Sequence, residues 1–421
     1  LGFADGSIPF SVNLESLIHY MGGVFAFTGS GKSNLTATII RKALRAIPDL
    51  KVVVFDVSAE YGIHIIDVLN ELPSRVLFTD SFKGSKNLSA EYFKRHATPE
   101  ALAGREKDFQ PKIDKLFADG KVEFVSSRLA GEEDVARFST YEGLIEVLSN
   151  TLNDKFGAVQ QKILVPQVVE TIKRFLRENR LEAEARFDSR TNDLISKIQP
   201  LLADLGSNSS LKKTFDSLGK VVDSIPPDEE EEGYTWGTLA DEILSSEKGS
   251  PRVFVVNLPE AEDARLETAN VIRDVFSRRK RSFTLSPRVL FVIDEAQEFI
   301  PQTPRKEDGT DQSSRAVERL LRHGRKYHLN CWISTQRVAH LNTNALQQLH
   351  SYFVSTMPRP YDRQLISDTF AIDDAFMERT LAFQNGDWLL TSFKATATQN
   401  IPVFFHAENN EDVLERYLKA D

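Results

Sequence analysis

The residues with the clearest chemical potential form the hexapeptide TGSGKS at positions 28–33, which follows a short apolar run and opens an amphipathic stretch. A glycine-rich turn between a strand and a helix can wrap its backbone N–H groups around a phosphate. In such a P-loop we expect Lys32 to contact the β- and γ-phosphate oxygens of a nucleotide and Ser33 to bind Mg²⁺. Ala26 replaces the first glycine of the usual pattern, and alanine fits there with a φ in the β region. The alternative is a Gly/Ser turn that merely caps a helix.

Two acids end the apolar segment RVLFVIDE at positions 288–295. A strand beside the P-loop strand would place Asp294 near Mg²⁺ and Glu295 where a water attacks the γ-phosphate. Acids also end buried strands for other reasons. Their occurrence together with a P-loop favours the catalytic interpretation.

A further apolar segment, LNCWIST at 329–335, leads into Gln336. An amide at that position could orient the attacking water or sense the γ-phosphate, or it could simply face solvent. Just upstream, the basic segment RAVERLLRHGRKYHL contains Arg325. This arginine could project into a neighbouring subunit and stabilise the charge on the transferred phosphate. A basic helix end that complements the helix dipole is the alternative.

The elements that must position these residues follow a βαβ rhythm, which predicts an α/β fold with a largely parallel sheet and helices on both faces. The segments expected as strands are 24–27, 52–57, 75–79, 252–258, 288–295, 329–335 and 351–356, followed by GDWLLTSF and IPVFF near the C-terminus. A short helix, NEDVLERYLKA, should close the chain.

The middle of the chain lacks strand signals and is expected to be a helical insertion. We expect residues 1–97 to form the first part of the core, 98–250 the insertion with the acidic linker IPPDEEEEGYTW, and 251–421 the second part of the core. The linker is most simply a solvated loop.

Composition indicates a globular protein, with 41% apolar and 27% charged residues among 421. A single cysteine, Cys331, argues for a reducing cytosol, and its apolar neighbours predict a buried packing role. No long apolar run or signal peptide is visible, and a start at Leu1 leaves room for a missing upstream piece. The net charge of −9 still permits a locally basic channel for nucleic acid.

Four segments together resemble the HerA branch of the HerA/FtsK ATPases: TGSGKSN, VVVFDVSAEYG, VLFVIDEAQEF and LLRHGRKYHLNCWISTQR. The lead-in LGFADGSIPFSVNLESLI resembles the HerA segment that joins an N-terminal β-barrel to the P-loop strand. The likeness covers about residues 1–58 and 252–421. HerA proteins carry a helical bundle in the intervening region.

The resemblance implies a RecA-like P-loop NTPase core and a hexameric motor that hydrolyses ATP and translocates duplex DNA through a central pore. It assigns nucleotide binding to Thr28, Gly29, Ser30, Gly31, Lys32, Ser33 and Asn34, and Mg²⁺ binding to Ser33 and Asp294. It makes Glu295 the base, Gln336 the sensor and Arg325 a finger acting in trans. Asp56 and Glu60 match the family's acidic pair near the nucleotide.

Partners implied by the resemblance are a NurA-like nuclease in DNA end processing and double-strand break repair, or another effector enzyme in antiphage defence. A secretion-type protein motor and a nucleotide-switched scaffold remain alternatives. DNA would be bound through its phosphates, independently of sequence.

Candidate pore segments are SFKGSKN, with Lys83 and Lys86, and PQTPRKEDG, with Arg305 and Lys306; polar surface loops are the alternative. The basic run Arg278, Arg279, Lys280 and Arg281 is expected to be a surface that complements a helix dipole.

Overall fold

The computed structural model describes residues 9, 11–79, 82, 84–125, 140–153, 159–181, 183, 185, 187–188, 190–206, 209–223, 234–259, 261–305, 308–396 and 401–419. The chain divides into two compact units. The first, called the core below, comprises Leu1–Val125 and Thr235–Asp421; the second, the helical unit, is Ser126–Tyr234. The acidic linker expected before Tyr234 and the expected pore residues Lys83 and Lys306 lie outside the described residues.

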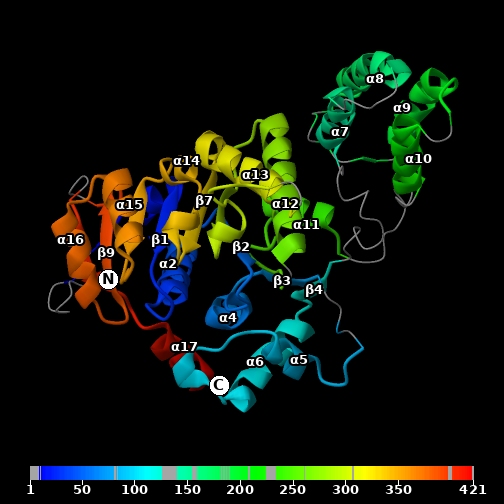
Figure 1. Ribbon diagram of the computed structural model, residues 1–421. Coiled ribbons are helices and arrows are strands. Elements are labelled where there is room, and N and C mark those ends of the chain that lie inside the picture. The colour runs from blue at the N-terminus through cyan, green and yellow to red at the C-terminus, as the bar shows by residue number, and fades with distance from the viewer. Residues whose placement is uncertain are drawn as a thin grey trace. The chain divides into compact units, whose positions relative to one another are not determined.

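The core is built on one sheet of ten strands in the order β10-β9-β8-β1-β7-β6-β2-β5-β3-β4 (Figure 1). The pairs from β8 to β4 are parallel, and β9 joins β8 and β10 antiparallel. The strands are β1 (Gly22–Phe25), β2 (Leu50–Asp56), β3 (Ser74–Phe78), β4 (Val122–Phe124), β5 (Val253–Asn257), β6 (Arg288–Ile293), β7 (Leu329–Thr335), β8 (Ser351–Val354), β9 (Asp387–Ser392) and β10 (Val403–His406).

The central strands are buried along their whole length, as β2 and β7 show. Successive strand residues face opposite sides, so helices must cover both faces of the sheet. One face packs on α2 (Lys32–Ala46) and α4 (Ile66–Glu71) in a single apolar cluster. A second group of mutually packed helices consists of α11 (Trp236–Leu244), α12 (Ala261–Ser282) and α13 (Thr310–His323) (Figure 1).

The other elements of the core are short helices and single turns that join these strands. They are α1 (Leu14–His19), α3 (Tyr61–His64), α5 (Leu88–Lys94), η1 (Glu100–Leu102), α6 (Glu106–Ala118), η3 (Ala296–Glu298), η4 (Gly324–Tyr327), η5 (Val338–His340), α14 (Thr343–Leu346), α15 (Pro360–Phe370), α16 (Asp374–Arg379), η6 (Thr380–Ala382) and α17 (Asn410–Lys419). No helix in the described ranges combines the length and the apolar character that a bilayer span requires.

The helical unit contains α7 (Tyr141–Asn153), α8 (Val159–Glu178), α9 (Thr191–Ile198), η2 (Gln199–Leu202) and α10 (Ser210–Asp223). Its helices share an apolar centre of their own, which includes Tyr141, Ile172 and Leu218. The sequence places the insertion at 98–250, whereas the division between the units falls after Val125 and before Thr235. The difference arises because α6, β4 and α11 pack against core elements.

All nine expected strands are present, with ends that shift by at most two residues. Strand β4 was not expected, because a three-residue, half-buried edge strand gives almost no periodic signal. We expected the strand that ends in Asp294 and Glu295, β6, to lie beside the P-loop strand β1, and this expectation was wrong. Strand β7 lies between β1 and β6, so Asp294 follows the second strand from β1, not the adjacent one.

Candidate active site

The segment TGSGKS forms the turn between β1 and α2, as its glycines require. Gly29 has a φ of 82° and Gly31 a φ of 95°, in the left-handed region that side chains disfavour. Helix α2 begins at Lys32, and no side chain caps its first turn. The free N–H groups of that turn are suited to an anion such as a phosphate. Ala26 is buried and is not among the residues with positive φ.

Lys32 and Glu295 form an ion pair, with 2.5 Å between Nζ and Oε1. Both side chains are largely buried, at 10% and 17% exposure. Glu295 follows β6 with a φ of 46° and a ψ of 52°, which is uncommon for a residue with a side chain. Strained backbone of this kind concentrates at functional sites. The structure thus brings together Lys32, expected to bind the γ-phosphate, and Glu295, expected to act as the base toward the attacking water.

Two glutamines hold the other carboxylate oxygen of Glu295. Nε2 of Gln297 donates to Oε2 at 2.7 Å, and Nε2 of Gln336 lies 3.4 Å from the same oxygen. Gln336 also accepts a hydrogen bond from the hydroxyl of Thr28 in the P-loop. The expected sensor therefore contacts both the P-loop and the expected base.

Besides Glu295, three acidic side chains lie at or just after the carboxyl ends of β2 and β6. The Ser33 hydroxyl donates to Glu60, and the Ser334 hydroxyl donates to Asp294. Asp56 is fully buried and accepts hydrogen bonds from the backbone N–H groups of Glu60, at 3.1 Å, and Tyr61, at 2.8 Å.

Burial and the nearby Asp294 raise the pKa of Asp56 to about 8, and burial also raises the pKa of Glu60. Burial is the larger cause and the neighbouring carboxylates the smaller one, and a cation bound beside them would lower both pKa values. The described residues contain no cluster of three His, Cys, Asp or Glu side chains arranged to enclose a metal. The hydroxyl of Ser33 and the carboxylate of Asp294 are oxygen donors that suit Mg²⁺, which keeps waters and phosphate oxygens among its ligands.

The side chain of Asn34 bonds to the segment near the C-terminus. Its Nδ2 donates to the carbonyl of Glu408 at 3.0 Å, and its Oδ1 accepts from the backbone N–H of Asn410. The side chain ties the start of α2 to the segment that precedes α17, and the assignment of Asn34 to nucleotide binding stays a prediction.

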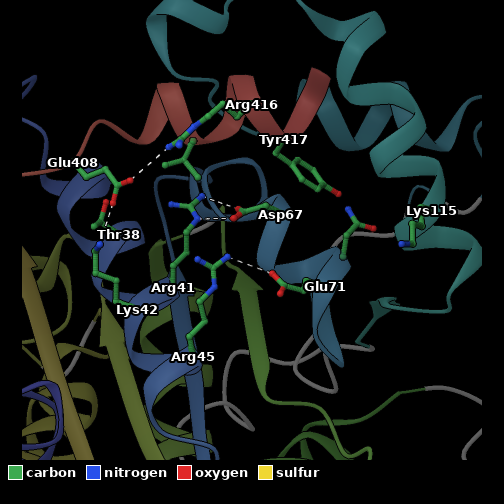
Figure 2. Close-up of a pocket in the computed structure, with 12 residues that line it drawn as sticks. Thr38, Arg41, Lys42, Arg45, Asp67, Glu71, Lys115, Glu408, Arg416 and Tyr417 are labelled. Carbon is green, nitrogen blue, oxygen red and sulfur yellow. Dashed lines mark hydrogen bonds and ion pairs between the residues drawn. The ribbon is translucent and has the colours of Figure 1, made fainter. Parts of the chain in front are cut away.

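A pocket of about 520 Å³ lies farther along α2, between α2, α4, α6 and α17 (Figure 2). At its base Arg41 is held by both oxygens of Asp67, at 2.7 Å each, and also donates to Asn410 and to the carbonyl of His64. Among the other cations that line the pocket, Arg45 pairs with Glu71, and Lys42 and Arg416 pair with Glu408. The network anchors the helix that follows the P-loop.

Arg325 does not approach the P-loop of its own chain. It lies in η4, ahead of the amino end of β7, whereas Gln336 follows the carboxyl end of the same strand. The side chain is exposed, and its guanidinium lies over the ring of Tyr20 at 5.2 Å. No hydrogen bond or ion pair from a described residue reaches the guanidinium.

The expected DNA-contacting residues are partly described. Lys86 and Arg305 are exposed, in the loops after β3 and β6. The basic run at the end of α12 differs from the expected surface, because Arg279 is buried and donates to the carbonyl of Pro287 at 2.6 Å, while Arg278 pairs with Asp241 and Asp274.

Sequence reasoning missed Gln297 and Ser334, the partners of Glu295 and Asp294. Only their positions in the sequence could have pointed to them: Gln297 lies two residues after Glu295, and Ser334 lies two residues before Gln336. Cys331 is buried in β7, as expected, and burial raises the pKa of its thiol.

Two curated proteins match most of this chain. Both are described as DNA double-strand break repair helicase HerA. The protein of Sulfurisphaera tokodaii is 22% identical over 85% of this chain and 59% of its own length. The Pyrococcus furiosus protein is 22% identical over 86% of this chain and 60% of its own length. The chain thus spans about three fifths of the length of these relatives.

Solved structures that resemble the chain include VirB4 of Thermoanaerobacter pseudethanolicus, with a TM-score of 0.48, 13% identity, and coverage of 97% of this chain and 95% of that one. The bacterial conjugative coupling protein TrwB has a TM-score of 0.44 and 11% identity, over 96% of this chain and 88% of that one. Likeness at these scores carries no information on function.

A family model described as "Helicase HerA, central domain" matches residues 1–327. This match and the observed sheet confirm the expected α/β fold with a RecA-like P-loop core. Because the match covers well over half of the sequence and includes the P-loop and both acids after β6, the chain belongs to the HerA helicase central-domain family.

Proposed function

We propose that this chain is the motor of an ATP-driven translocase that moves on duplex DNA. The observation that carries the proposal is the meeting of Lys32, Glu295 and Gln336 at a turn built to bind phosphate. A phosphate-binding turn alone would support only nucleotide binding. A buried carboxylate beside its lysine adds a group that can activate water.

The side chains divide the work of phosphoryl transfer. The N–H groups at the start of α2 hold the phosphates, and Lys32 leaves Glu295 to contact the β- and γ-oxygens. Mg²⁺, bound through Ser33 and Asp294, would neutralise charge on the phosphates. Once Lys32 has moved, Glu295 is free to accept a proton from the attacking water, while Gln336 remains beside both the base and Thr28.

The position of Arg325 supports a ring. The guanidinium stands at the edge of the sheet opposite its own P-loop, so only another subunit could bring a phosphate to it. Its five donors have no acidic partner among the described residues, and an aromatic face holds the group in place. We infer that Arg325 acts on the nucleotide of the next subunit in a homohexamer.

DNA would pass over the loops at the carboxyl ends of the strands, where exposed Lys86 and Arg305 can meet phosphates. Such contacts carry no sequence information. Both relatives are described as double-strand break repair helicases, and a NurA-like nuclease is the partner that we propose for this chain in DNA end processing.

ATP turnover with and without duplex DNA tests the proposal. We expect turnover that rises on addition of blunt duplexes of unrelated sequence, with Lys32→Ala as the inactive control. Absence of turnover under both conditions would refute the enzyme assignment. Turnover that no duplex stimulates would refute the translocase and favour a nucleotide-switched scaffold.

A further inference from the structure

A hydrogen-bonded chain of three side chains connects β7 to the expected base. The hydroxyl of Thr335 donates to Oε1 of Gln297 at 2.6 Å, and Nε2 of Gln297 donates to Oε2 of Glu295 at 2.7 Å. Thr335 is the last residue of β7 and is fully buried. Gln297 lies in the single turn η3 that follows β6. The chain therefore runs between the ends of two neighbouring strands.

The chemistry of this chain requires an amide in the middle. Thr335 already accepts a hydrogen bond from the backbone N–H of Arg337 at 2.9 Å, so its own proton is free to point at Gln297. With its oxygen engaged there, the amide of Gln297 presents its NH₂ group to Glu295. A carboxylate or an alkyl side chain at this position could not do both.

The same contact sets the orientation of the Glu295 carboxylate. Gln297 binds Oε2, whereas Oε1 faces the P-loop and holds Lys32. When Lys32 moves to a nucleotide, Glu295 loses its strongest partner, and the Gln336 contact at 3.4 Å is long for a hydrogen bond. Gln297 is then the group best placed to keep Oε1 directed at the attacking water.

We propose that Gln297, anchored by Thr335, is a positioning residue that fixes the carboxylate of Glu295 for catalysis. This inference rests on the proposed ATP hydrolysis. Its consequence is that the base and the sensor share one anchor, because Thr335 is bonded to Gln297 and directly precedes Gln336.

The experiment compares variants of the full chain by kcat and KM for ATP, by affinity for a fluorescent ATP analogue, and by thermal unfolding. Gln297→Met keeps the length of the side chain and removes both hydrogen bonds. Gln297→Glu keeps an acceptor for Thr335, removes the donor to Glu295 and sets a second carboxylate against it. Thr335→Val removes the anchor with little change of shape. Glu298→Gln is the matched control, since Glu298 lies in the same turn but pairs with Arg265.

We expect kcat to fall about 10- to 100-fold in both Gln297 variants, which is part of the ~10²- to 10⁴-fold that a general base contributes. KM, nucleotide affinity and unfolding temperature should stay close to those of the wild type. Thr335→Val should lower kcat less, and combining it with Gln297→Met should add no further loss, because both changes break one chain. The control should keep its kcat.

Wild-type turnover, measured first, tests the proposed function, and its absence would overturn both proposals. An unchanged kcat in Gln297→Met, with turnover in the wild type, would overturn only the positioning role. A parallel loss of kcat, nucleotide affinity and stability in Gln297→Met would also overturn the positioning role, because a merely structural role gives that result. Full additivity of Gln297→Met with Thr335→Val would overturn it as well, because the two residues would then act independently.

Discussion

Replacing Asp67 with asparagine should destabilise the core by about 3 kcal/mol or more. The side chains of Arg41 and Asp67 are only 5% and 8% exposed, and they share two hydrogen bonds of 2.7 Å. Asparagine has nearly the same shape, but it removes the charge and turns one acceptor into a donor that faces the guanidinium. Arg41 would remain buried with only neutral oxygens as partners, namely the amide oxygen left at position 67 and those of Asn410 and His64.

The magnitude follows from the burial. Removing one partner of a buried ion pair costs roughly 3–5 kcal/mol, because the remaining charge keeps its desolvation penalty. A unit of about 310 residues, at about 2.1 cal/mol/K of unfolding entropy per residue, then loses roughly 5–8 °C in Tm.

Tryptophan fluorescence can follow this loss in the core alone, because all three tryptophans, Trp236, Trp332 and Trp388, belong to the core. The matched control is Glu71→Gln. It breaks the Arg45–Glu71 pair between the same two helices, where both side chains are about 60% exposed (Figure 2). Such surface pairs contribute about 0–1 kcal/mol, so the control should barely change Tm.

Replacing both partners, as Arg41→Met with Asp67→Leu, should recover most of the lost stability, because no buried charge is then left alone. If Asp67→Asn unfolded at the same temperature as Glu71→Gln, the assignment of a buried, charge-balanced anchor for α2 would be refuted. If the double variant were much less stable than Asp67→Asn, the loss would come from packing and not from the unpaired charge.

Four further predictions concern turnover and DNA. Glu295→Gln should still bind nucleotide but lose about two to four orders of magnitude in turnover, whereas Lys32→Ala should lose binding as well; near-normal turnover of Glu295→Gln would contradict its role as base. Arg325→Ala should assemble and bind ATP yet hydrolyse it poorly, and mixing with Lys32→Ala subunits should restore part of the turnover. No recovery in rings shown to exchange subunits would count against a finger in trans. Cys331→Ala should leave turnover intact, since the thiol is buried in β7, and a folded, assembled but inactive variant would disprove this. Duplex binding should weaken by orders of magnitude between about 50 and 200 mM salt, and a flat salt response would rule out a phosphate-lined pore.

The phosphate-binding turn and the strands could be predicted from the sequence, because both depend on the residues of a short segment. Only glycine suits the backbone at positions 29 and 31, and runs such as VVVFDV at 52–57 are typical of strands buried on both faces. These two signals led to the expectation that Lys32 and Glu295 serve one nucleotide site; their ion pair was not expected.

The remaining features depend on contacts between distant parts of the chain. Strand order places β7 beside β1, and no local pattern encodes that choice. Asn34 belongs to the P-loop motif, yet its side chain bonds Asn410, 376 positions away. Gln297 looked like an ordinary turn residue, and only the fold brings it to Thr335.

The placement of β7 has a consequence for how many nucleotide sites are complete in an assembly of these subunits. The strand is seven residues long, so its ends lie roughly 20 Å apart. Under the proposed arrangement, Gln336 at one end serves the nucleotide of its own subunit, and Arg325 at the other end serves that of the next. Every strand β7 then belongs to two sites at once. A closed ring completes all of its sites, whereas an open chain of the same subunits leaves one nucleotide without an arginine and one arginine without a nucleotide. Opening the ring to admit DNA would therefore silence one site while the others stay complete.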